Sequence, residues 1–225
     1  SASGNAVFLT GDTAIQYQIS RAGPVPISAA TDGPHGLRSA PYSPQAAALV
    51  RALITEPRGH ALENEYNRIT RRAVEAEAQL TAALAGTAVQ TPFPGNNTLA
   101  AELRVVAQTI AARGALGSRR QVFLVSLGGF DFHDGLMVDQ PVLLSKVSEA
   151  MSAFHRATVE LGVSQQVTAF TASDFGRALA SNGNGTDHGW GGHHFIVGGA
   201  VRGQQFYGTP PPISIGETNA PQDQW

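Results

Sequence analysis

One apolar run in the middle of the chain limits the possible fold more than any other feature of the sequence. Residues 121–127 are Gln-Val-Phe-Leu-Val-Ser-Leu; they end at two glycines and lead directly to Asp131 and His133. Such a run is typical of a buried strand in a parallel sheet. Side chains two positions apart in extended backbone point to the same side, so Asp131 and His133 can bind one metal ion together. Because ligands of open α/β sheets bind beyond the carboxyl ends of the strands, we expect a site here.

The sequence as a whole divides into three segments. Residues 1–44 form an irregular segment that is rich in Gly, Pro and Ser, with short strand signals. Residues 45–113 have helical periodicity, and residues 120–212 alternate between strand and helix patterns. We expect residues 1–225 to form a single, partial α/β domain in which residues 120–212 are the core that carries the metal site.

The periodicity also predicts the individual elements. The expected helices span residues 45–54, 60–85, 98–112 and 141–161. The expected strands span residues 6–9, 15–19, 121–127, 167–171 and 194–197. Steps of this length between the last three strands imply parallel strands with right-handed crossovers. We therefore predict a mostly parallel sheet flanked by helices.

Composition excludes several classes of function. The formal net charge is -2 and no basic run is present, which argues against a partner that is a nucleic acid. The chain has no cysteine, so thiolate zinc sites, disulfides and cysteine nucleophiles are excluded. Lys146 is the single lysine, which argues against a Schiff-base or phosphate-loop lysine. No apolar run approaches the roughly 18 residues of a transmembrane segment, and nothing predicts an oligomeric state.

Ligand-type side chains occur at four places near expected strand ends or in a Gly-rich loop. They are Asp131 with His133, Asp174, Asp187 with His188, and His193 with His194. Carboxylates mixed with imidazoles, without thiolates, suit zinc, manganese or iron, whereas calcium prefers oxygen ligands. A metal ion here would act as a Lewis acid and lower the pKa of a bound water or hydroxyl. The alternative for each aspartate is a turn or helix-capping role.

Two further assignments remain open at this point. Of the adjacent histidines, strand alternation directs one to each face, and His193 is preferred because it lies nearer the loop. Arg177 is a candidate for binding an anionic group of a substrate through two parallel hydrogen bonds, and the alternative is a surface pair with Asp174 or Asp187. The nucleophile is unknown, because no serine lies in a Gly-x-Ser-x-Gly turn.

Three motifs resemble a known family. They are Arg-Gln-Val-Phe-Leu-Val-Ser-Leu-Gly-Gly-Phe-Asp-Phe-His-Asp at 120–134, Ser-Asp-Phe-Gly-Arg at 173–177, and Gly-Thr-Asp-His-Gly-Trp-Gly at 185–191 followed by His-His-Phe-Ile-Val-Gly-Gly. Together, within residues 97–212, they resemble the bacterial family catalogued as domain of unknown function 1501, within the alkaline phosphatase and sulfatase-like superfamily. The resemblance implies an alkaline phosphatase-like fold, here expected to be incomplete.

The resemblance also implies a set of metal ligands. In the superfamily, an acidic residue with a nearby histidine is followed by an aspartate after a Thr-rich strand and by a histidine ahead of the last apolar strand. The matching positions are Asp131, His133, Asp174 and His188. Phe175 replaces the histidine that often follows the second aspartate. Asp187 and His193 are therefore the candidates for additional ligands.

The function that the resemblance implies is that of an exported, metal-dependent hydrolase, with zinc as the expected metal. Its substrate would be a small phosphate or sulfate ester or a related anionic compound, and its location the periplasm or cell surface. Family members are longer, so the chain is expected to be a fragment. The alternative is a non-catalytic secreted or surface protein that retains the fold. A third possibility, a carbohydrate-active enzyme with paired carboxylates, leaves the histidines unexplained.

Overall fold

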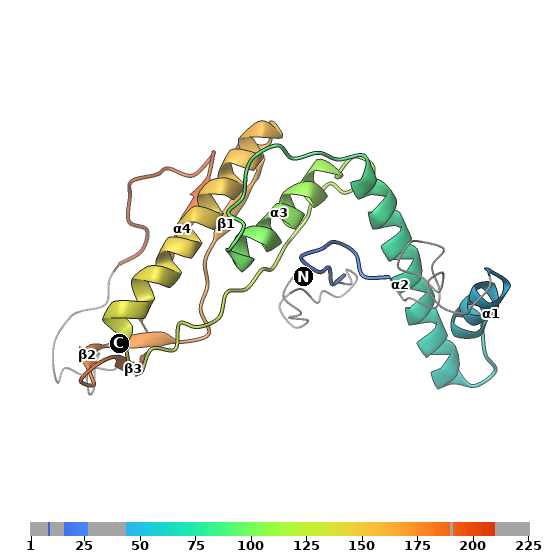
Figure 1. Cartoon of the computed structure of the whole chain (residues 1–225), viewed down its shortest axis with the longest axis horizontal. Helices are drawn as coiled ribbons and strands as arrows, with labels where there is room; N and C mark the ends of the chain where they lie inside the picture. Colours follow the sequence, from blue (N-terminus) through green and yellow to red (C-terminus); the bar gives the residue numbers. More distant parts are fainter. Residues whose placement is uncertain (1–8, 10–15, 27–43, 190, 210–225) are drawn as a thin grey trace. The chain divides into compact units, whose positions relative to one another are not determined.

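The computed structural model describes residues 9, 16–26, 44–189 and 191–209. The helices are α1 (Pro44–Thr55), α2 (Ala61–Ala85), α3 (Thr98–Ala111) and α4 (Leu136–Glu160), with a short 3-10 helix η2 (Ser164–Gln166) (Figure 1). The strands are β1 (Thr168–Phe170), β2 (Gly176–Ser181), β3 (Thr186–Gly189) and β4 (Ile196–Gly198). Contacts divide the chain into two compact units: Ser1–Ala88 with Gln108–Ser126, and Val89–Ala107 with Leu127–Trp225.

The prediction of a mostly parallel, alkaline phosphatase-like sheet is wrong. The described part of the chain is mainly helical, and its strands form two antiparallel sheets of two strands each, β1 with β4 and β2 with β3. Residues 121–127 are not part of a strand. A parallel pair needs a crossover between two hydrogen-bonded strands. Here the extended segment before α4 has no hydrogen-bonded partner strand, so no parallel pair is formed. Strand β1 instead pairs with β4, which follows it in the chain after the β2–β3 hairpin.

The predicted helices are confirmed, because the apolar periodicity and the helix ends are local signals. The largest difference is at α4, which begins at Leu136 although the sequence predicted a start near Pro141. Gly135 adopts the left-handed conformation, with φ 66°, and its carbonyl accepts hydrogen bonds from the N–H groups of Val138 and Asp139. Pro141 lacks an N–H group and removes one helical hydrogen bond, yet the helix continues through it. The predicted strand at 6–9 lies almost wholly outside the described residues, and residues 16–19 do not form a strand.

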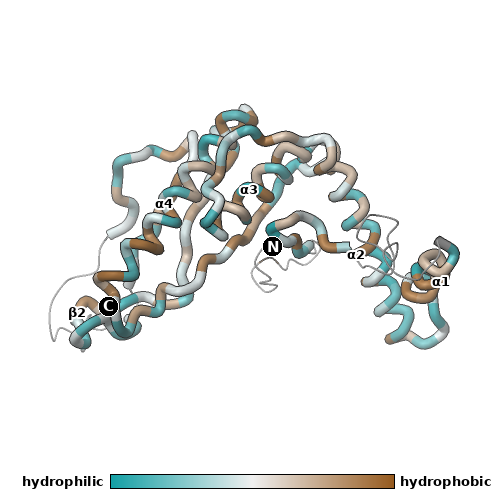
Figure 2. Tube along the Cα trace, in the orientation of Figure 1, coloured by the Kyte–Doolittle hydropathy of each residue, from teal (hydrophilic) through white to brown (hydrophobic). Residues whose placement is uncertain are grey.

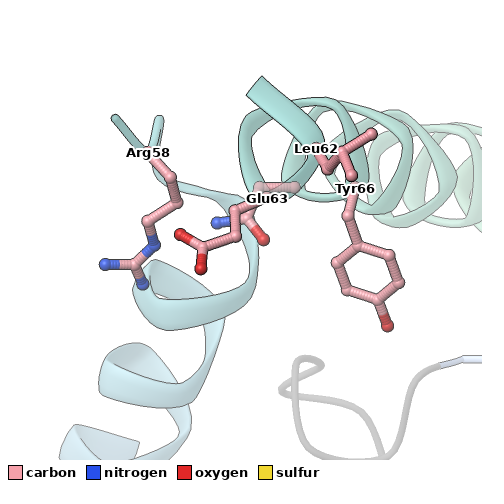
Figure 3. A pocket seen from close by; sticks show the side chains of 5 residues that line it. Arg58, Leu62, Glu63 and Tyr66 are labelled. Atoms are coloured by element: carbon pink, nitrogen blue, oxygen red, sulfur yellow. The ribbon is translucent and has the colours of Figure 1, made fainter. Parts of the chain in front are cut away.

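In the first unit, α1 and α2 are joined through a buried amide. The Asn67 side chain donates hydrogen bonds to the carbonyl oxygens of Leu53 (3.3 Å) and Glu56 (2.6 Å), which satisfies acceptors at the C-terminal end of α1. An open pocket of about 320 Å³ lies beside this junction. Figure 3 shows the Glu63 side chain between those of Arg58 and Tyr66 at this pocket.

In the second unit, Asn97 connects α3 to α4. Its side-chain oxygen accepts a hydrogen bond from the N–H of Ala100 (3.2 Å) and caps α3, while its side-chain nitrogen donates to the carbonyl of Lys146 in α4 (2.8 Å). Asn97 is only 2% exposed. The buried face of α4 consists of Val147, Ala150, Met151, Ala153, Phe154, Ala157 and Thr158. Asn97 therefore lies at the N-terminal end of α3 as its cap, one residue before the predicted helix at 98–112.

The C-terminal end of α4 is tied to the segment before α3. The Glu160 carboxylate accepts hydrogen bonds from the N–H of Gln90 (2.7 Å) and from the N–H (2.8 Å) and hydroxyl (2.5 Å) of Thr91. The hydroxyl of Thr91, followed by the two backbone N–H groups, lowers the pKa of Glu160. The charged carboxylate is thus the form that the fold favours.

Polar and apolar residues alternate along α2 and α4, the two longest helices (Figure 2). Within the described part of the chain, no helix combines the length and the apolar character that crossing a bilayer requires.

Candidate metal centre

The candidate site is formed by the loop at 130–134 and the β2–β3 hairpin, which lie beside the N-terminal end of α4 (Figure 1). In the hairpin, Gly176 pairs with Gly189, Arg177 with His188 and Ser181 with Thr186. The turn between the strands is Asn-Gly-Asn-Gly, residue types that suit hairpin turns. The Gly-rich composition predicts a loop here, and the structure instead has a hairpin.

Close backbone contact between the hairpin and the loop requires a glycine at the turn. A Cβ atom at Gly185 would lie 2.4 Å from the carbonyl oxygen of Phe132. This distance is too short for any residue that has a Cβ atom, so the position requires glycine. The adjacent N–H of Thr186 donates a hydrogen bond to that same oxygen (3.2 Å). The hairpin therefore approaches near enough for its side chains to meet Asp131 and His133.

Three of the predicted ligands converge at this point. The Nε2 atoms of His188 and His133 lie 2.8 Å and 3.1 Å from Oδ1 of Asp131. One ligand atom from each of the three side chains can be chosen so that all lie within 4.8 Å of one another. About half of each side chain is exposed. Of the four predicted ligands Asp131, His133, Asp174 and His188, the structure brings Asp131, His133 and His188 together; that they bind a metal ion stays a prediction.

Arg177 holds the Asp131 loop against the hairpin. Its guanidinium donates hydrogen bonds to Oδ1 of Asp131 (2.8 Å), to the carbonyl of Phe130 (2.8 Å) and to the carbonyl of Thr186 (2.5 Å). The side chain is 19% exposed, much less than the 57% of the Asp131 side chain. These contacts are those of a residue that organises the site; its predicted role in binding a substrate anion stays a prediction.

Asp187 lies behind His133. Its Oδ1 is 3.2 Å from Nδ1 of His133 and accepts a hydrogen bond from the side-chain nitrogen of Asn182 (3.0 Å). A carboxylate on the second ring nitrogen of a ligating histidine fixes the orientation of the ring. Asp187 was predicted as a possible additional ligand, and in this structure it is the partner of His133.

Both carboxylates of the site are stabilised in the charged form. The hydrogen bond from His188, together with the charges of His133, His188 and Arg177, lowers the pKa of Asp131. The hydrogen bonds from Asn182 and His133 lower the pKa of Asp187. At neutral pH the site therefore presents negative oxygens, the form in which a carboxylate binds a metal ion.

Asp174 and His193 do not join the group of three. Both side chains are exposed, and the group found among the described residues contains only Asp131, His133 and His188. The neighbouring His194 has its Nδ1 atom 3.3 Å from the hydroxyl oxygen of Thr171. Roles for Asp174 and His193 as ligands stay predictions.

At Phe175 the family resemblance implied only a missing ligand, but the ring of Phe175 stacks on His188. The ring centroids are 4.0 Å apart and the planes differ by 9°. This contact depends on the pairing of Arg177 with His188 across the hairpin, so the sequence carries no local signal for it.

The fold and the site together define an α+β protein with a candidate metal centre made of one carboxylate and two imidazoles. Residues 46–222 match the model of a family described as a protein of unknown function, DUF1501, and the chain belongs to this family. The match confirms the family to which the motifs within residues 97–212 point, and it extends beyond them on both sides; the alkaline phosphatase and sulfatase-like superfamily stays a prediction. No curated protein and no solved structure matches the chain.

Proposed function

We propose that this chain carries the metal site of a hydrolase that acts on phosphate or sulfate esters or on related anionic compounds. The observation that carries the proposal is the convergence of one carboxylate oxygen and two imidazole nitrogens within 4.8 Å. The substrate class and the location, periplasm or cell surface, rest on the resemblance of the motifs to the alkaline phosphatase and sulfatase-like superfamily.

The spacing of the three donors supports a small divalent ion such as zinc, with manganese or iron as the alternatives. Ligand atoms about 2.0–2.2 Å from a tetrahedral zinc ion lie about 3.3–3.5 Å from one another. The nitrogens of His188 and His133 lie 2.8 Å and 3.1 Å from Oδ1 of Asp131, and all three donors lie within 4.8 Å of one another, so side-chain rotations would have to bring them to the required spacing.

The surroundings of His133 also support a cation. Each of its two nitrogens faces a carboxylate oxygen: Nδ1 faces Asp187 at 3.2 Å and Nε2 faces Asp131 at 3.1 Å. A protonated imidazole satisfies both carboxylates, but a neutral imidazole has one N–H group and satisfies only one of them. A cation shared by Nε2 and Asp131 would satisfy the other, with Nδ1 donating to Asp187.

The roles of the residues follow from these contacts. A metal ion held by Asp131, His133 and His188 would act as a Lewis acid on the ester group that is cleaved. Asp187 orients His133, and Arg177 fixes Asp131 and places a positive charge beside the site, where it attracts an anionic group. Asp174 remains the candidate for a further ligand.

A second candidate function is supported by the exposure of the site. Asp131, His133 and His188 are about half exposed and are already joined by hydrogen bonds with Arg177. In a non-catalytic secreted or surface protein, the sole role of this network would be to hold the hairpin against the loop.

Metal analysis of the purified chain tests the proposal. We expect near-stoichiometric zinc, manganese or iron in the wild type, loss of that metal in Asp131→Ala and His188→Ala, and retention in the control His60→Ala, whose imidazole is exposed at the start of α2. Less than about a tenth of an equivalent after incubation with each metal contradicts the metal site. Bound metal without hydrolysis of aryl phosphate or sulfate esters favours the non-catalytic protein.

A further inference from the structure

Phe175, Arg177 and His188 form a stack on one face of the β2–β3 hairpin. Arg177 and His188 are directly opposite each other in the ladder, and Phe175 lies two positions before Arg177. The Phe175 ring is parallel to the His188 imidazole, with centroids 4.0 Å apart, and the guanidinium carbon of Arg177 lies 5.1 Å from the Phe175 centroid. The aromatic ring is thus in contact with both a candidate ligand and the residue that holds Asp131.

The backbone beside Phe175 is fixed by its neighbour. A Cβ atom at Gly176 would lie 2.2 Å from the carbonyl oxygen of Gly191, so this position admits only glycine. The close approach brings the N–H of Arg177 to 3.0 Å from that oxygen. The sequence Phe-Gly-Arg therefore fixes the position of the aromatic ring along the hairpin.

His188 needs such a restraint because its strand is short and exposed. β3 has four residues, and the side chain of His188 is 48% exposed. An exposed imidazole is free to rotate about its side-chain bonds, and this rotation moves Nε2 away from the other donors. The parallel phenyl ring restricts the imidazole to the plane in which Nε2 lies 2.8 Å from Oδ1 of Asp131.

We infer that Phe175 is a positioning residue of the metal site, whose ring holds the imidazole of His188 in the orientation that binds the ion. The inference rests on the proposed function, since it concerns the same site. It assigns a role to the position where the family resemblance implied a missing ligand.

Zinc titration of three variants of the whole chain tests the inference. Phe175→Leu keeps the apolar volume but removes the stacking ring, and we expect its zinc affinity to fall about three- to tenfold. Phe175→Tyr restores the ring and should bind zinc as the wild type does. Phe206→Leu, at a phenylalanine that is 96% exposed, is the matched control and should be unchanged. Equal affinity of wild type and Phe175→Leu overturns the inference, as does equal loss in Phe175→Leu and Phe175→Tyr.

The NMR spectrum of the metal-free chain separates this inference from the proposed function. A phenyl ring stacked at 4.0 Å shifts the carbon-bound protons of the His188 ring upfield, and Phe175→Leu should remove that shift. A wild-type resonance that coincides with that of Phe175→Leu overturns the stack itself. A wild type that shows the shift but binds no zinc, manganese or iron overturns the proposed function and the positioning role, while the stack stands as a purely structural contact.

Discussion

Replacing Asn97 tests the packing that supports the second unit. Asn97→Ala removes the cap of α3 and the hydrogen bond to Lys146 of α4. A lost helix cap costs about 1 kcal/mol, and a lost hydrogen bond contributes about 1 kcal/mol more. The carbonyl of Lys146 lies within α4 and keeps its helical hydrogen bond, so we add no penalty for an unsatisfied acceptor. The expected decrease in the free energy of unfolding is therefore about 2 kcal/mol.

Urea unfolding followed by far-UV circular dichroism measures this change. Asn97→Ser keeps a capping oxygen but lacks the donor to Lys146, so about half of the loss should return. The matched control is Asn96→Ala, because Asn96 is the exposed neighbour and its replacement should cost less than about 0.5 kcal/mol. Equal stability of Asn97→Ala and Asn96→Ala would refute the role assigned to the amide.

Two more predictions concern charged residues. The pKa of Glu160 is lowered in the folded chain, so its contribution to stability is present above the ordinary value of 4.5 and is lost as the pH falls through the lower folded value. The difference in melting temperature between wild type and Glu160→Gln should therefore decrease as the pH is lowered. Glu149→Gln, at an exposed glutamate of α4, serves as the control. Arg177→Lys should weaken zinc binding about tenfold, because one ammonium cannot reproduce three bonds in a planar fork. Unchanged zinc affinity with weaker phosphate binding would instead favour Arg177 as a substrate-binding residue.

The helices could be predicted because their signals are local. Apolar periodicity and the Asn97 cap lie within a few residues of each other in the sequence, and α1, α2 and α3 follow them closely. The sheet could not be predicted in the same way, since a strand exists only if a distant partner supplies hydrogen bonds. The apolar run at 121–127 has the composition of a buried strand, but it has no ladder in the structure.

The candidate site was predicted better than the fold that carries it. Asp131 and His133 share one loop, and His188 was placed at the same point by the order of the motifs. A hairpin, and not the carboxyl ends of parallel strands, brings His188 to Asp131. Asn182 and Phe175 were missed as site residues because their roles depend on the pairing of β2 with β3.

The two short sheets also affect how the protein behaves at high concentration. Within the described residues no further strand pairs with the outer edges of these sheets, and open strand edges are templates on which other chains can aggregate. In the β1–β4 sheet, the paired residues Phe170 and Ile196 are 62% and 46% exposed, which adds apolar surface to this hazard. Each of these strands has only three residues. An incoming chain would gain few hydrogen bonds there, so the brevity of the strands itself protects the molecule from fibrillar self-association.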